Sequence, residues 1–175
     1  MNDPLKKEES KMGEIEQEQE EPLEEALGES GQSRKGSFAG FVLLSEGEWD
    51  KRQFIQDMKE KWDIAVVEDA DQRDDAVVFK VDDMIAAVSL MPAPIPNGEA
   101  EANAENNYLW KDAVKVAKEH RAHLMVAVLG KEENILEKGM FYTKLAAACC
   151  RQKYAVGVYT SGVVFEPRFY ESFAD

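Results

Sequence analysis

Two histidines separated by two residues, His120 and His123, are the first residues whose type and spacing suggest a chemical role. Imidazoles at positions i and i+3 of a helix lie close together and could share a metal ion. The pair falls where a predicted helix gives way to a strand, and neither an HExxH pattern nor a nearby cysteine completes a ligand set. We therefore predict no metal and no other cofactor, and we interpret the histidines as residues favoured near a helix C-terminus by the helix dipole.

Acidic residues at both ends of a short apolar run could serve acid–base chemistry or bind a cation. Asp74 and Asp75 precede this run, and Asp82 and Asp83 follow it. Acidic side chains are common in turns because they hydrogen-bond to the local backbone, and the sequence shows no EF-hand spacing. We interpret all four aspartates as turn residues.

The candidate nucleophiles are Cys149, Cys150 and Ser161. The two cysteines are adjacent in a helical pattern, where successive side chains point apart, so we expect them to be reduced and at least one to be buried. A thiol in an apolar stretch is inert, although the nearby Arg151 and Lys153 could favour a thiolate. Ser161 lacks the flanking glycine of a G-x-S-x-G elbow. The sequence therefore indicates no catalytic nucleophile.

A phosphate-binding loop has no support, because neither G-x-x-x-x-G-K nor G-x-G-x-x-G occurs. Gly130 and Lys131 do lie at a predicted junction between a strand and a helix, where anions can dock. One glycine and one lysine are weak evidence, and we interpret the segment as a connecting loop.

The stretch MPAPIPNGEAEANAENNYLW, residues 91–110, is the most unusual part of the chain. Rigid extended backbone and aromatic side chains make contacts at low entropic cost, so Pro94, Tyr108 and Trp110 could line a binding groove. The alternative is that the prolines only end a strand and that Trp110 packs beneath this exit. The alternative needs no partner, and we favour it.

These residues must be positioned by strands and helices that the apolar periodicity predicts. Asn97 is expected to cap the helix that follows the prolines, with Glu99 and Glu101 in its first turn. The predicted strands are 38–44, 64–69, 76–81, 84–91, 123–130 and 154–160, and the predicted helices are 48–62, one over 97–120 that is interrupted near 106–107, and 132–152. The residues expected to face the core from the last two helices are Leu109, Ala113, Val116, Ala117, Ile135, Leu136, Met140, Phe141, Leu145 and Ala148.

The predicted order is β-α-β-β-β-α-β-α-β, which indicates an α+β fold with a mixed sheet covered by helices on one face. A βαβ unit with a right-handed crossover is expected in its first part, and ferredoxin-like packing is the preferred topology. After the last strand, Phe169, Tyr170 and Phe173 recur at helical spacing. They have little left in the chain to pack against.

The charge of the chain excludes some partners. The formal net charge is −14, which argues against nucleic acids and anionic membranes. Residues 1–37 hold eleven Asp and Glu against five Lys and Arg, a net of 5 − 11 = −6, and few large apolar residues. We predict a disordered acidic tail over 1–37 and one domain over 38–175. An alternative for the tail is a transient helix or docking motif around Ile15, Leu23, Ala26 and Leu27.

No segment has the roughly 20 apolar residues needed to cross a bilayer, and the N-terminus does not have the pattern of a secretory signal. We therefore expect a cytoplasmic protein.

Four segments carry a resemblance to a known family: GFVLLSEGEWD, residues 91–110, HRAHLMVAVLG and FYTKLAAACCRQKYAVGVYTSGVVFEPRFYESFAD. Over about residues 38–175 the chain resembles the bacterial family catalogued as domain of unknown function 4261. Members of that family typically continue further, which implies that this chain lacks a C-terminal portion. The resemblance implies a bacterial cytoplasmic setting and supplies no activity or catalytic residue.

Two classes of function follow. The first is a noncatalytic protein-binding or accessory module that engages another protein, and the absence of convergent motifs favours it. The second is an enzyme or small-molecule binder whose site is completed by a missing C-terminal portion, with Glu166 and Arg168 contributing from this half.

Overall fold

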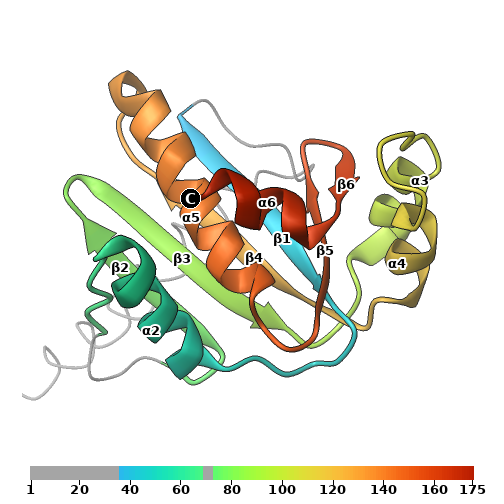
Figure 1. The fold of residues 1–175 in the computed structure, drawn as a ribbon, viewed down its shortest axis with the longest axis horizontal. Helices are drawn as coiled ribbons and strands as arrows, with labels where there is room; N and C mark the ends of the chain where they lie inside the picture. The colour runs from blue at the N-terminus through green and yellow to red at the C-terminus, as the bar shows by residue number, and fades with distance from the viewer. Residues whose placement is uncertain (1–35, 69–72) are drawn as a thin grey trace, which may run out of the picture.

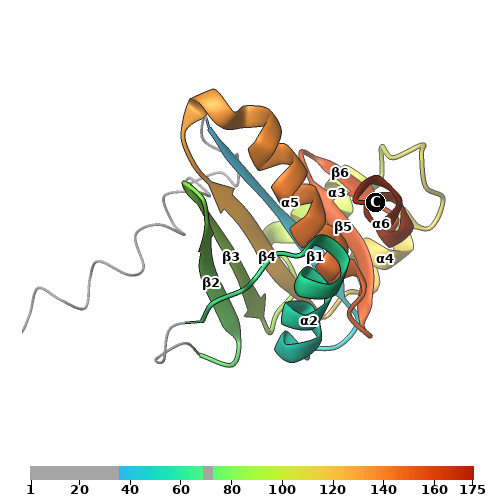
Figure 2. The ribbon, with the colours of Figure 1, turned by 60° about the vertical axis from the view of Figure 1, so that its left-hand side comes forward.

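A six-stranded sheet with helices packed on it forms the part of the chain that the structure describes (Figures 1 and 2). The computed structural model describes residues 36–68 and 73–175. Most of the predicted tail over 1–37 lies outside the described residues. The strands are β1 (Ser37–Leu44), β2 (Ala76–Val81), β3 (Met84–Met91), β4 (Ala122–Leu129), β5 (Ala155–Thr160) and β6 (Val163–Phe165). The helices are α2 (Lys51–Trp62), α3 (Glu99–Ala104), α4 (Ala113–Glu119), α5 (Ile135–Cys150) and α6 (Pro167–Phe173), with 3-10 turns η1 (Pro96–Gly98) and η2 (Glu132–Asn134).

The strand order in the sheet is β2-β3-β4-β1-β5-β6. The α+β class is confirmed, but every neighbouring pair is antiparallel, so the expected mixed sheet does not form. Because β1 is antiparallel to both β4 and β5, these two strands run in the same direction, and α5 joins them. This is one split βαβ unit with β1 in its middle. β1 and β3 likewise run in the same direction on either side of β4, and α2 lies in the connection between them. The two split βαβ units interleave in the order β3-β4-β1-β5, which is ferredoxin-like packing, so the preferred topology is confirmed, with β2 and β6 added at the edges. The βαβ unit expected in the first part of the chain forms with β3 as its second strand.

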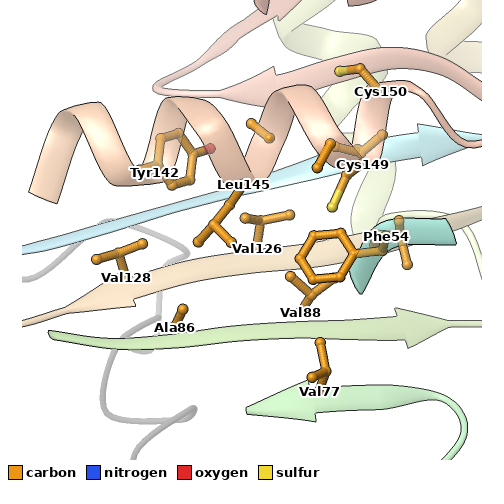
Figure 3. Close-up of a cluster of buried hydrophobic side chains, with 14 of the residues drawn as sticks. Phe54, Val77, Ala86, Val88, Val126, Val128, Tyr142, Leu145, Cys149 and Cys150 are labelled. Atoms are coloured by element: carbon orange, nitrogen blue, oxygen red, sulfur yellow. The ribbon is translucent and has the colours of Figure 1, made fainter. Parts of the chain in front are cut away.

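The larger core lies between the sheet and the helices α2 and α5 (Figure 3). Alternate residues of each strand point to this face, and Val126 of β4 lies there beneath Leu145 of α5 and near Phe54 of α2. The rings of Phe79 and Phe141 meet edge to face with centroids 6.0 Å apart. Complete burial of one such side chain stabilises the fold by about 1.5–3 kcal/mol. The alternation of apolar residues therefore fixes which strand face receives α5.

A second, smaller core lies on the opposite face of the sheet, beneath α3 and α4. Leu43 and Tyr159 point to this face, because their strand neighbours Val42 and Val158 belong to the larger core. Its other buried members are Ile95, Ala100, Ala104, Ala113, Ala117 and Val164. Helices therefore cover parts of both faces, and the prediction of a single covered face is wrong.

The strand predicted over 64–69 is wrong, because its described part, residues 64–68, is not assigned to a strand. Asp63 adopts a left-handed conformation (φ 54°) and caps α2 through its backbone N–H. The chain after it packs Ile64 and Val66 against the larger core and exposes Val67. The branched residues of this segment are therefore explained by their packing on the larger core. The segment cannot pair with β1, the strand that precedes α2, because β4 and β5 occupy both sides of β1.

The helical segment after the prolines also differs from the prediction. Asn97 does not cap a helix: it lies in η1 with φ 61°, and Gly98 takes the cap position of α3 with φ 62°. The predicted interruption is confirmed, because α3 ends at Ala104 and α4 begins at Ala113. Leu109 falls in the connection and is exposed, not in the core.

The first half of α5 presents apolar residues to solvent. Ile135, Leu136 and Met140 are exposed, although the periodicity predicts them in the core. Leu136 and Met140 lie one turn apart on the side of the helix that faces away from the sheet. Phe141, Leu145 and Ala148 are buried, as predicted.

None of the described helices is long and apolar enough to cross a membrane.

Candidate functional site

The two histidines have backbone partners rather than a metal-like arrangement. His120 and His123 are both buried, and each bonds to the segment after β3. The Nε2 of His120 accepts a hydrogen bond from the Ile95 N–H at 2.9 Å, and Nδ1 of His123 contacts the Ala93 carbonyl at 2.8 Å. Within residues 36–68 and 73–175, no group of three His, Cys, Asp or Glu side chains lies close enough to hold a metal ion.

The aspartates serve local structure. Asp82 takes a left-handed turn conformation (φ 54°) in the β2–β3 hairpin, and Asp83 lies 3.9 Å from Lys131 and within hydrogen-bond distance of Asn134. Asp75 pairs with Arg73 before β2, and this bond lowers the pKa of the carboxyl. The turn interpretation therefore accounts for these contacts, and Lys131 is engaged by a carboxylate.

The two cysteines are buried in α5 and free, as predicted. Burial raises the pKa of both thiols far above the ordinary value. A buried, protonated thiol is a poor nucleophile. Ser161 is an exposed turn residue with φ 51° between β5 and β6.

The three residues proposed for the proline groove lie in different surroundings. Pro94 is exposed, and Tyr108 is 91% exposed. Trp110 is half-buried and packs against the second core, where a Cβ at Gly157 would lie 3.6 Å from its ring. Trp110 therefore packs as the alternative interpretation predicts, and only Tyr108 presents a whole ring to solvent.

Glu166 and Arg168 lie at the start of α6. They pair with each other, Arg168 Nε lying 3.4 Å from Glu166 Oε1, and the Arg168 side chain is largely exposed. Exposed ion pairs of this kind contribute little to stability. The amide of Asn107 donates a hydrogen bond to the Val164 carbonyl, which fastens the loop that carries Tyr108 to β6.

A row of three phenylalanines runs from β6 along α6. Phe165 stacks on Phe169 with centroids 4.9 Å apart, and Phe169 contacts Phe173 at 4.6 Å. We call Phe165, Phe169 and Phe173 the aromatic ladder. Phe169 is 43% exposed and Phe173 is 70% exposed. The spacing of four residues between successive members is visible in the sequence, but only the last two were singled out there.

The opposite side of α6 is fixed to the body of the protein. The ring of Tyr170 meets Tyr142 of α5 edge to face at 6.4 Å, and burial raises the pKa of its hydroxyl to about 12. The indole N–H of Trp62 donates to the Ala174 carbonyl at 2.9 Å, and Lys61 lies 3.5 Å from Asp175. Figure 1 shows α6 lying across α5, in front of the sheet. The ladder is therefore held on an anchored helix.

Ion pairs flank the ladder. Residues 166–175 contain Glu166, Glu171 and Asp175 against Arg168, a net of 1 − 3 = −2. Glu166 lies beside Arg168 and Asp175 lies beside Lys61, and the charges of Glu171 and Asp175 contribute to the raised pKa of Arg151. The carboxylates near the rings therefore have cations close to them.

One buried charge had no signal in the sequence. Lys138 of α5 is completely buried, and its Nζ donates to the carbonyls of Gly36 at 2.5 Å and Gly130 at 3.3 Å. These carbonyls lie just before β1 and just after β4. A Cβ at Gly130 would lie 3.1 Å from the Lys138 stem, so the glycine leaves room for the lysine. Lys138 thus joins two strand ends to α5.

Comparison with known proteins gives no match among family models, curated proteins or solved structures. The resemblance to domain of unknown function 4261 stays a prediction from the sequence motifs.

Proposed function

We propose that the protein is a noncatalytic, cytoplasmic protein-binding module that contacts its partner through the aromatic ladder. The observation that supports this is the combination of an anchored α6 with two exposed phenylalanines in mutual contact. Aromatic side chains dominate interface energetics, and a preformed row of rings loses little conformational entropy on binding. A folded chain has no intrinsic need to keep two such rings in water.

A noncatalytic role is favoured because the candidate chemical groups in residues 36–68 and 73–175 have structural partners. The histidines bind backbone, the thiols are buried, and Glu166 pairs with Arg168. We find no observation that favours the enzyme alternative.

The partner that fits is a different protein with an apolar centre and a net positive charge, because this chain has a formal net charge of −14. A second copy of this chain would bring together two molecules with a formal charge of −14 each. Charge complementarity therefore favours a heterologous partner.

The test compares the wild-type chain with the double variant Phe169→Ser/Phe173→Ser. A matched control, Val67→Ser/Leu109→Ser, removes two exposed apolar side chains far from α6 in the sequence. Because Val67 and Leu109 are exposed, we expect the control to unfold within about 0.5 kcal/mol of the wild type. The ladder variant also loses the stacking of Phe169 on Phe165, which contributes about 0.5–1.5 kcal/mol, and it should remain folded. Affinity capture followed by calorimetric titration of the purified partner then measures binding.

We expect the ladder variant to bind at least about thirtyfold more weakly, as loss of an interface hot spot does, while the control binds like the wild type. Equal affinity of all three proteins would contradict the proposal. A large loss of stability in the ladder variant would show instead that the rings support the fold. A dimer in sedimentation velocity that only the ladder variant abolishes would assign the surface to self-association.

A further inference from the structure

The proline segment between β3 and α3, residues 92–98, is held down by very few groups. Ile95 is its one buried residue and belongs to the second core. Because three of the positions from 92 to 96 are proline, only Ala93 and Ile95 carry a backbone N–H there. From the described residues, two side-chain hydrogen bonds reach this stretch, and both involve histidines: His120 accepts from the Ile95 N–H, and His123 donates to the Ala93 carbonyl. The attachment of the segment therefore depends on two imidazoles.

The contacts of His120 define its protonation state. Its Nε2 accepts from the Ile95 N–H and so carries no proton, and its Nδ1 lies against the Ala117 carbonyl and so carries one. Both nitrogens of the neutral ring are thus used. A second proton would sit on Nε2 and point at the Ile95 N–H, turning a hydrogen bond into a repulsion between two donors.

His123 also favours the neutral form. Its Nδ1–H donates to the Ala93 carbonyl, and its ring meets Phe41 edge to face at 5.4 Å. Burial lowers the pKa of His123; the hydrogen bond to Ala93 opposes this, and the charge of a protonated His120 lowers it further. A charge on His120 therefore disfavours protonation of His123.

The neighbouring elements present no compensating charge. The strand neighbours of His123 are Leu43 in β1 and Met91 in β3, and residues 92–98 contain no ionisable side chain. Within α4, His120 contacts the backbone carbonyl of Ala117. The flanking residues Lys118, Glu119 and Arg121 are exposed, and Arg121 pairs with Glu46. Among the described residues, neither imidazole forms an ion pair with a carboxylate.

We propose that His120 and His123 form a pH-sensitive clasp, which holds residues 92–98 on the second core at neutral pH and releases them on acidification to about pH 5. The released state accepts protons that the clasped state excludes, so acid shifts the equilibrium toward release. If both protons are excluded, each pH unit below the histidine range shifts this equilibrium up to about 100-fold. Release would remove Ile95 from the second core and free the start of α3, whose cap makes no side-chain hydrogen bond.

The experiment follows the full chain by NMR from pH 8 to pH 5. The sequence contains only two histidines, so every imidazole signal belongs to the clasp. We expect the hydrogen-exchange protection factor of the Ile95 amide to collapse over the range in which the imidazoles titrate. The indole signal of Trp110, which packs on the second core, should shift with it, whereas those of Trp49 and Trp62, which pack on the larger core, should stay constant.

The double variant His120→Gln/His123→Asn tests the cause, because glutamine keeps an acceptor near the Nε2 position and asparagine keeps a donor near Nδ1. We expect Ile95 protection to become independent of pH in this variant. Glu99→Gln is the control for carboxylate titration, because Glu99 of α3 accepts a hydrogen bond from the Tyr159 hydroxyl. We expect this variant to lose Ile95 protection over the same pH range as the wild type. If the double variant does not fold, the wild-type titration decides alone. The proposal is overturned if the imidazoles become charged while Ile95 stays protected, or if the double variant loses protection as the wild type does.

Discussion

Gly40 of β1 is a residue at which the addition of a single methyl group should strongly lower the free energy of unfolding. A Cβ at this residue would lie 2.1 Å from the Tyr142 hydroxyl and 2.9 Å from both Cβ and Oγ1 of Thr160. The Tyr142 ring has little room to retreat, because it stacks on Phe38 at 5.9 Å and meets Tyr170 at 6.4 Å. We expect Gly40→Ala to destabilise the protein strongly by overpacking.

The magnitude follows from the distance that must be gained. Ordinary contact begins at 3.4 Å, so the hydroxyl must move by 3.4 − 2.1 = 1.3 Å, which forces α5 and its buried residues away from the sheet. Overpacking of a core typically costs about 1–3 kcal/mol, and we expect about 3 kcal/mol here. With a urea dependence of about 2 kcal/mol/M, the unfolding midpoint should fall by about 1.5 M.

A double-mutant cycle identifies the clash as the cause. The Tyr142 hydroxyl is buried without a hydrogen bond of normal geometry among the described residues, so Tyr142→Phe should change stability by less than about 1 kcal/mol. It should also recover at least about 1 kcal/mol of the loss caused by Gly40→Ala. The matched control is Gly47→Ala, where the nearest atoms to a new Cβ are 3.9 Å away and stability should change little.

Urea unfolding followed by tryptophan fluorescence measures all four variants. A Gly40→Ala variant that unfolds within about 0.5 kcal/mol of the wild type would contradict the predicted clash, as would a Tyr142→Phe change that restores none of the loss.

Three further predictions concern buried polar groups. Lys138→Met should lower the free energy of unfolding by about 1–3 kcal/mol, because two partly buried carbonyls lose their donor, whereas Lys144→Met on the same helix should change it little in urea unfolding. Cys149 and Cys150 should resist a thiol reagent at pH 8 in the folded protein and react at once in urea, because burial raises the pKa of both thiols. The stability contributed by His123 should be complete above pH 6.5 and decline as the pH falls toward its lowered folded pKa, because the unfolded chain takes up the proton first.

Each of these has a result that contradicts it. Equal loss of stability in the two lysine variants would remove any special role of the buried ammonium. Rapid labelling of either cysteine without denaturant would mean that α5 opens readily. The free energy of unfolding of His123→Asn should vary less with pH between about 7.5 and 5.5 than that of the wild type. If the two proteins show the same variation, groups other than His123 cause it.

Local patterns in the sequence predicted the elements whose form depends on near neighbours. The hairpin of β2 and β3 is an example, because a two-residue turn at Asp82 and Asp83 pairs Val81 with Met84 and so sets the register of the whole pair. The helix α2 is another: Phe54 and Met58 lie one turn apart and are both buried. Of the aromatic ladder, Phe169 and Phe173 were recognised by their spacing, because four residues make about one helical turn.

The remaining features depend on contacts that no local pattern contains. Residues 64–68 have strand composition but no strand partner, because β4 and β5 occupy both sides of β1. The exposure of Leu136 and Met140 depends on which side of α5 meets the sheet. Lys138 is buried because two carbonyls from the ends of distant strands converge on it.

The sequence by itself determined the α+β composition, the ends of most helices and strands and the absence of a recognised catalytic motif, because these follow from residue type and from spacing within about one or two turns. Only the tertiary structure decided that β1 lies between β4 and β5, that α3 and α4 cover the other face, and that His120 bonds to Ile95. Hydrogen bonds and apolar burial act over a few ångströms in space. A pattern along the chain therefore cannot specify which distant segment will lie within that distance.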